Sequence, residues 1–189
     1  EAILAKYPNM VLLSDEVYEY ITFEQKHISA NTRAQLLNRT VIVSSFGKTF
    51  HITGWKMGYL IAPEAMMIEI KKVHQFLVFC VNNIAQEALA QYVKISDFKG
   101  IQALYLAKRN LFRSEMQQSR FELLPCEGSF FQTAKYDEIS TKRDTEFVKD
   151  LVKDFGVATI PTSVFYKHAP NQKIIRFCFA KDDNTLIQA

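Results

Sequence analysis

The stretch that decides the fold is residues 44–58, SSFGKTFHITGWKMG, which follows the β-branched run TVIV at residues 40–43. Apolar runs of this length, bounded by polar residues, are typical of buried strands, so we predict a strand over residues 40–46. The segment that follows this strand in the sequence carries two lysines, Lys48 and Lys56. The sequence therefore predicts a strand whose carboxyl end leads into a lysine-bearing loop.

A second strand is expected at residues 10–14, an apolar run that continues into SDEVY at residues 14–18. Residues 58–62 form a candidate third strand, and residues 31–38 are polar with a helical pattern. Short apolar strands with helical segments between them indicate an α/β sheet covered on both faces. Ligands of open α/β sheets bind beyond the carboxyl ends of the strands, so the segments after the first two strands are expected to face one crevice.

The pattern after Pro63 is helical over residues 64–120, with breaks at 79–83 and 96–100. An amphipathic helix is expected at residues 144–155, because its apolar residues recur at helical spacing and Gly156 follows it. Three more strands are expected at residues 129–134, 157–160 and 174–180. The second half of the chain therefore predicts a smaller α+β unit.

Composition and charge narrow the class of protein. The 189 residues are 48% hydrophobic, which suits a globular chain with a real core and excludes a disordered one. The formal net charge is only +3, and charges of both signs alternate along the chain, so we expect no nucleic-acid partner. No apolar run approaches the roughly 20 residues that span a bilayer, so we expect no membrane partner.

The cysteines and histidines are scattered. The three cysteines, Cys80, Cys126 and Cys178, lie far apart among apolar or aromatic neighbours, which favours buried thiols in a reducing compartment. We therefore expect a cytoplasmic protein. The four histidines have neither a partner at helical spacing nor a nearby cysteine at metal-ligand spacing, so we expect no metal site.

Each polar residue near the strand ends has an ordinary structural explanation when taken alone. An aspartate after a strand is most often a turn or cap residue, and a lone lysine is usually solvated. The combination is harder to obtain by chance. An acid-x-x-Tyr segment at residues 15–18 is followed about thirty residues later by Ser-x-x-Lys at 45–48, and a second cation, Lys56, comes eight residues after that lysine.

With these segments the chain resembles the fold-type I pyridoxal-phosphate aminotransferases, in the branch of kynurenine/glutamine transaminases and bacterial methionine aminotransferases. The likeness continues through His74-Gln75 and CEGSFF at residues 126–131 to IRFCFA at residues 175–180. The resemblance implies an α/β fold, in which residues 1–95 are the rest of a large cofactor-binding domain with a mixed, mostly parallel sheet and a connecting helix. Residues 96–189 would form a small α+β C-terminal domain.

The resemblance also implies pyridoxal 5′-phosphate (PLP) as the cofactor and a role for each motif residue. Lys48 would hold the cofactor as a Schiff base and shuttle a proton between substrate and cofactor. Asp15 would pair with the pyridine nitrogen, and Tyr18 would donate its phenol to the 3′-oxygen. Ser45 and Lys56 would hold the phosphate, although many relatives carry arginine, with its bidentate fork, at the position of Lys56.

Arg176 is the candidate substrate-binding residue. It lies between Ile175 and Phe177 in an apolar strand, where a charge is costly unless it is paired. A residue on the outward face of the strand is the structural alternative. The resemblance implies a bidentate clamp for the α-carboxylate of the substrate.

The leading hypothesis is an aminotransferase that moves the amino group of a methionine-, phenylalanine-, kynurenine- or glutamine-type amino acid to a 2-oxo acid in a ping-pong cycle. Two alternatives stay open: a PLP-dependent carbon–sulfur β-lyase and a non-catalytic regulator domain that senses PLP. The resemblance implies a homodimer in the full-length protein. Both ends of the chain look cut, so we expect an incomplete fragment in which the strands near Met10 and Thr40 expose apolar surface.

Overall fold

The computed structural model describes residues 2–189, and the chain divides into two compact units. The first unit comprises Glu1–Tyr20 and Lys26–Lys99, and the second comprises Ile21–Gln25 and Gly100–Ala189. The short segment Ile21–Gln25 thus belongs to the second unit, although the residues on either side of it belong to the first.

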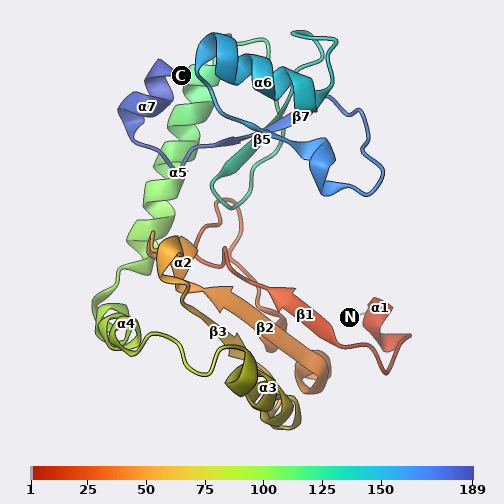
Figure 1. The fold of residues 1–189 in the computed structure, drawn as a ribbon, viewed down its shortest axis with the longest axis vertical. Coiled ribbons are helices and arrows are strands. Elements are labelled where there is room, and N and C mark those ends of the chain that lie inside the picture. The colour runs from red at the N-terminus through yellow and green to blue at the C-terminus, as the bar shows by residue number, and fades with distance from the viewer. Residues whose placement is uncertain (1) are drawn as a thin grey trace. The chain divides into compact units, whose positions relative to one another are not determined.

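The first unit is built on a three-stranded mixed sheet. Strand β2 (Thr40–Ser45) lies in the middle, parallel to β1 (Leu12–Asp15) and antiparallel to β3 (Gly58–Ile61) (Figure 1). The predicted strands at residues 10–14, 40–46 and 58–62 are therefore confirmed, with ends that differ by one or two residues. The α/β class is confirmed as well.

The burial of these strands differs from the expectation. Val41 and Ile42 of β2 are buried, whereas Leu13 of β1 is 67% exposed. The expected apolar surface is thus present near Met10, but the same expectation for the strand near Thr40 is wrong, because β2 has a hydrogen-bonded neighbour on each side. A sheet covered on both faces is likewise wrong for β1, whose side chains alternate between half-buried and exposed.

The helical region after Pro63 forms three helices, and both predicted breaks are confirmed. These helices are α3 (Glu64–Leu77), α4 (Asn83–Ile95) and α5 (Phe98–Glu115). The first break contains Phe79 in the left-handed region, with φ of 65°, followed by Asn82, whose side chain caps α4 by accepting a bond of 3.0 Å from the Ala85 amide. No helix among residues 2–189 is long and apolar enough to cross a membrane.

The shorter helices of the first unit bring one correction. The first helix of the described residues is α1 (Ala2–Ala5), and the expected helix at residues 31–38 is two 3₁₀ helices, η1 (Ala30–Thr32) and η2 (Ala34–Arg39). The Arg33 between them has extended backbone angles, which interrupts an α-helical turn.

The second unit is an antiparallel sheet with helices. The strand order is β4-β5-β7-β6, formed by β4 (Glu122–Leu123), β5 (Phe131–Lys135), β7 (Ile174–Cys178) and β6 (Ile160–Pro161). Helix α6 (Asp144–Phe155) ends at Gly156, whose φ of 72° suits a glycine. The unit also contains the 3₁₀ helices η4 (Met116–Gln118) and η5 (Thr162–Phe165), and helix α7 (Asp183–Gln188).

Residues Ile21–Gln25 are fixed to the second unit by backbone and side-chain bonds. Thr22 forms a β-bridge with Gly128, and the Phe23 amide donates to the Glu127 carbonyl at 2.8 Å. Arg109 pairs with Glu24 at 2.8 Å and stacks over the Phe23 ring at 4.6 Å. These contacts explain why this segment belongs to the second unit.

The cysteines are free thiols, but one of them is not buried. Cys126 and Cys178 are half-buried, whereas Cys80 is exposed. The expectation of three buried thiols is wrong for Cys80 because it lies in the break between α3 and α4, where few side chains of this chain cover it.

Candidate functional site

The strand register brings the predicted motif residues of the first unit to one edge of its sheet. Asp15 ends β1 and aligns with Val43 of the parallel strand β2, so the carboxyl ends of both strands meet at this edge. Ser45 ends β2 and aligns with Gly58, the first residue of β3. Helix α2 (Phe46–Thr49), which carries Lys48, follows β2 directly and lies beyond its arrowhead in Figure 1.

Asp15 has the ordinary turn role that an aspartate after a strand often has. Its Oδ1 accepts a bond of 3.2 Å from the Val17 amide and so starts the turn that carries Tyr18. Asp15 is exposed, and a carboxylate has about four lone-pair positions. The turn bond therefore leaves acceptor capacity for a ligand at this edge.

Ser45 fixes the loop that carries the two lysines. Its Oγ accepts a bond of 3.0 Å from the Gly47 amide, which caps α2, and donates to the Met57 carbonyl at 3.1 Å. Thr53 Oγ1 donates to the Gly47 carbonyl at 3.1 Å. Lys48 is half-buried and Lys56 is exposed. Hydrogen bonds within the loop thus hold its start near its end, and the loop carries the Ser45 hydroxyl and the Lys48 and Lys56 side chains.

Two residues of this loop have a left-handed backbone conformation that residues other than glycine rarely adopt. His51 has φ of 59°, and Lys56, which ends the 3₁₀ helix η3 (Thr53–Trp55), has φ of 56° and ψ of 41°. Left-handed non-glycine residues cost roughly 1–3 kcal/mol each and cluster at functional sites. The strain at Lys56 is consistent with a side chain whose position matters more than local stability.

Gly58 is required by its close approach to the neighbouring strand. A Cβ at this position would lie 2.7 Å from the Ser44 carbonyl oxygen, whereas a Cβ at Gly54 would meet nothing within 4 Å. We expect Gly58→Ala to lower the free energy of unfolding by about 1–3 kcal/mol, because backbone must move to relieve the clash. Gly54→Ala is the matched control and should stay within about 0.5 kcal/mol of wild type in urea unfolding. Equal effects of the two substitutions would contradict this account of Gly58.

Two acidic residues, one within the acid-x-x-Tyr segment and one just after it, were given no role from the sequence. The first is Glu16, which is buried and accepts bonds from Ser14 Oγ at 3.0 Å and the Ala30 amide at 2.9 Å, and lies 2.8 Å from His27 Nε2. Burial alone would raise the pKa of Glu16, but the bonds with His27, Ala30, Ser29 and Ser14 together hold that pKa below its usual value. The alternation of β1 is the signal that could have found it, since residues 12, 14 and 16 share the inner face.

The lowered pKa of Glu16 gives a pH dependence of stability. Because the pKa is lower in the folded than in the unfolded state, the carboxylate stabilises the fold above about pH 4.5 and loses this effect as the pH falls through the folded value. We expect Glu16→Gln to flatten the decline of the urea-unfolding midpoint below this pH. Glu87→Gln, at an exposed position of α4, should leave the decline unchanged.

The second missed acid is Glu19, in the same turn as Tyr18. Its Oε1 accepts a bond of 3.1 Å from Ser44 Oγ and a short bond from the Tyr59 hydroxyl. Burial and the bond to Glu19 raise the pKa of Tyr59 to about 12. Glu19 therefore ties the turn after β1 to both β2 and β3, next to Ser45.

Arg176 lies in the middle strand pair of the second unit, aligned with Thr133 on β5 and Ile160 on β6. Its guanidinium carbon lies 4.0 Å from the centre of the Phe131 ring and 5.2 Å from that of Phe165. Its Nε is buried and has no hydrogen-bond partner among the described residues. Buried donors are nearly always paired in native proteins, so an acceptor supplied by a ligand is a direct explanation.

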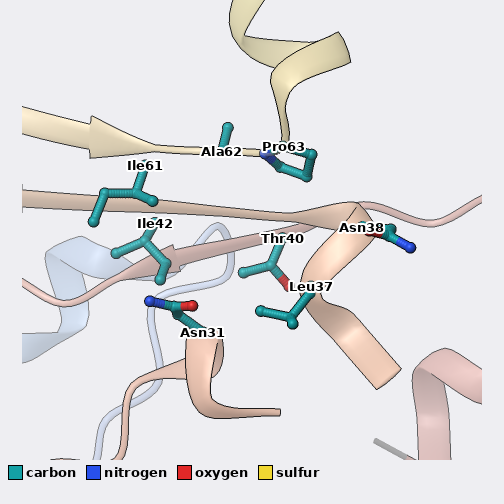
Figure 2. A pocket seen from close by; sticks show the side chains of 8 residues that line it. All are labelled: Asn31, Leu37, Asn38, Thr40, Ile42, Ile61, Ala62 and Pro63. Carbon is teal, nitrogen blue, oxygen red and sulfur yellow. The ribbon is translucent and has the colours of Figure 1, made fainter. Parts of the chain in front are cut away.

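A pocket of about 250 Å³ lies at the other end of the first sheet, away from the motif residues. Figure 2 shows its lining by Asn31, Leu37, Asn38, Thr40, Ile42, Ile61, Ala62 and Pro63. Thr40 begins β2 and Ile61 ends β3, so this pocket is at the edge opposite Ser45. It offers amides and a hydroxyl but no charged group, and no predicted site residue lines it.

Comparison with known proteins places the chain in the same family as its motif residues indicate. The family model described as aminotransferase class I and II matches residues 1–189. A methionine aminotransferase of Escherichia coli (strain K12) is 46% identical over 181 residues, which cover 94% of this chain and 47% of that protein. A kynurenine–oxoglutarate transaminase of Dictyostelium discoideum is 34% identical over 213 residues, which cover 99% of this chain and 49% of that protein.

Solved structures give the same result for the fold. The crystal structure of YbdL from Escherichia coli, a protein identified with a methionine aminotransferase function, superposes with a TM-score of 0.94 at 44% identity and covers 100% of this chain and 51% of its own. The N-succinyldiaminopimelate aminotransferase of Mycobacterium tuberculosis superposes with a TM-score of 0.91 at 28% identity, covering 98% and 49%. The chain thus spans about half the length of the curated relatives that it matches.

Proposed function

The chain belongs to the class I and II aminotransferases, and from this premise we propose that the whole protein is a PLP-dependent transaminase. It would transfer the amino group of an apolar or aromatic amino acid to a 2-oxo acid. The observation that carries the proposal is the placement of Lys48, in a helix that starts directly after the central strand, at the sheet edge shared by Asp15, Ser45 and the start of β3.

The groups at this edge fit PLP by their chemistry. PLP carries a ring nitrogen, a phosphate and an aldehyde, and these call for a carboxylate, cationic or hydroxyl donors, and a primary amine. Asp15, Ser45, Lys56 and Lys48 supply these groups at one end of the first sheet. Glycine at position 58, where even a methyl group would clash with the Ser44 carbonyl, allows β2 and β3 to approach closely at this edge.

The family resemblance implies a task for each residue, and the chemistry of each side chain suits that task. Asp15 would keep a proton on the ring nitrogen through charge pairing, and Tyr18 would donate its phenol to the 3′-oxygen. Ser45 and Lys56 would hold the phosphate, Lys56 as a point charge. Lys48 would bind the cofactor covalently and, once released, accept the proton from the substrate α-carbon. When bound, PLP supplies an electron sink for that carbon.

Arg176 would hold the α-carboxylate of the substrate. Its unpaired buried Nε and its aromatic neighbours support this role, because a guanidinium stacked on rings keeps its edge for bidentate bonds. The substrate class rests on the relatives, which are named for methionine and for kynurenine with oxoglutarate. We also propose a homodimer, as the family resemblance implies, and a cytoplasmic location, because the three scattered cysteines are free thiols.

The test is an amino-transfer assay on the whole protein loaded with PLP. Methionine, phenylalanine, kynurenine and glutamine are each supplied with a panel of 2-oxo acids, and the new amino acid is measured. The proposal expects product only when a 2-oxo acid is present. Release of pyruvate from a cysteine conjugate without any 2-oxo acid would identify a β-lyase instead, and absence of both reactions in a PLP-loaded protein would favour a PLP-sensing regulator.

A further inference from the structure

We propose that Asp144 and Ser163 form a positioning pair that holds Phe165 against Arg176 and thereby sets the affinity for the amino-acid carboxylate. This inference rests on the proposed function of Arg176. It concerns the second unit alone, in which α6, η5 and β7 contribute the residues.

Asp144 is a buried acid that accepts two hydrogen bonds from Ser163. Its exposed fraction is 4%, and that of Ser163 is 3%. Oδ2 accepts from the Ser163 amide at 2.7 Å, and Oδ1 accepts from the Ser163 hydroxyl at 2.7 Å and from the Thr145 amide at 2.9 Å. An acid in the first turn of a helix needs no burial to interact with the helix dipole. The helix dipole therefore does not account for the burial of Asp144, and two of its three bonds lead to Ser163 in η5.

The bonds of η5 fix it at both sides. Ser163 is held by Asp144 on α6, and Thr162 Oγ1 donates to the carbonyl of Ile174 on β7 at 2.9 Å. Phe165 ends this short helix two residues after Ser163. Phe165 is 63% exposed, so core packing does little to hold it. The position of the Phe165 ring thus depends on the anchored backbone before it.

The Phe165 ring and the Phe131 ring both contact the Arg176 guanidinium, at 5.2 Å and 4.0 Å from its central carbon. Among the described residues Arg176 has no acidic partner in an ion pair. Stacking on rings restricts the plane of the guanidinium without using its N–H groups. Asp144 therefore acts on the substrate indirectly. It orders η5, which places the Phe165 ring, and that ring orients the Arg176 guanidinium.

The experiment compares Asp144→Asn and Phe165→Leu in the whole, PLP-loaded protein. We expect either substitution to raise the KM for the amino acid about 3- to 30-fold, the range of a lost cation–π contact, with kcat within about twofold of wild type. The dissociation constant of PLP, measured by absorbance titration, should not change. Asp150→Asn is the matched control on α6, where Asp150 pairs with Lys142 at the surface, and should leave KM unchanged.

A double substitution separates positioning from general destabilisation. Because both residues act through the same ring, Asp144→Asn combined with Phe165→Leu should raise KM no further than the larger single effect. Additive effects would overturn the proposal, as would a wild-type KM in Phe165→Leu. If Asp144→Asn does not fold, Ser163→Ala replaces it in the same cycle.

Arg176→Ala distinguishes the failure of this inference from that of the proposed function. If Arg176→Ala weakens amino-acid binding and Phe165→Leu does not, the positioning pair is refuted and the carboxylate clamp stands. If Arg176→Ala leaves the KM at its wild-type value, the clamp itself is wrong and the positioning proposal falls with it.

Discussion

Replacing Lys48 with alanine is expected to lower the rate of amino transfer in the whole protein by at least about 10³-fold. General acid–base catalysis alone contributes roughly 10²- to 10⁴-fold, and Lys48 is proposed to supply both the proton transfer and the covalent bond to the cofactor. The cofactor should still bind noncovalently, because Ser45, Lys56 and Asp15 stay in place. The measurement is kcat for amino transfer together with the absorbance of the bound cofactor.

Lys71→Ala is the control for this substitution, since Lys71 is an exposed lysine on α3 in the same unit. It should retain wild-type activity. An active Lys48→Ala protein, or one that keeps a cofactor absorbance band sensitive to borohydride, would show that another lysine carries the cofactor.

Arg176→Ala is expected to weaken amino-acid binding by about 2–5 kcal/mol, which is the cost of truncating one partner of a buried, charge-assisted pair. This corresponds to a rise in the dissociation constant of roughly 30- to 4,000-fold. PLP should bind as in wild type, because the proposed partner of Arg176 is the substrate. The dissociation constant is measured from the spectral change of the PLP-loaded protein on addition of the amino acid.

Arg176→Lys should fall between wild type and Arg176→Ala, because a lysine keeps the charge but not the bidentate fork. Arg120→Ala removes an exposed arginine of the same unit, which donates to the Glu138 carbonyl, and should have no effect. An unchanged dissociation constant in Arg176→Ala would mean that this arginine has a structural role only.

The fold was predictable wherever local pattern and tertiary structure agree. The β-branched run before Ser44 is the central strand, and the helix breaks near Phe79 and Ser96 coincide with an unusual backbone angle and with capping residues. Strand β4 was not predicted, because Glu122–Leu123 is too short to show any alternation. The placement of Ile21–Gln25 in the second unit was also missed, since it depends on a bridge to Gly128, which is distant in sequence.

In the candidate site too, local pattern predicted some residues, whereas others depend on tertiary contacts. The order of motif residues predicts that Asp15, Ser45 and Lys48 follow neighbouring strands, and the register places those strand ends at one sheet edge. Glu19, which is half-buried, and Asp144, which is buried, gave no sequence signal, because the sequence does not show which acidic side chains are covered. Only the partners reveal them, Tyr59 for Glu19 and Ser163 for Asp144.

Lys48 is proposed to carry the cofactor. The most direct test is to load the whole protein with PLP, reduce it with borohydride, digest it and locate the modified lysine by mass spectrometry. We predict a single pyridoxyl group on Lys48, and none on the nearby Lys56. A pyridoxyl group on any other lysine, or no modified lysine in a protein that binds PLP, would contradict the claim.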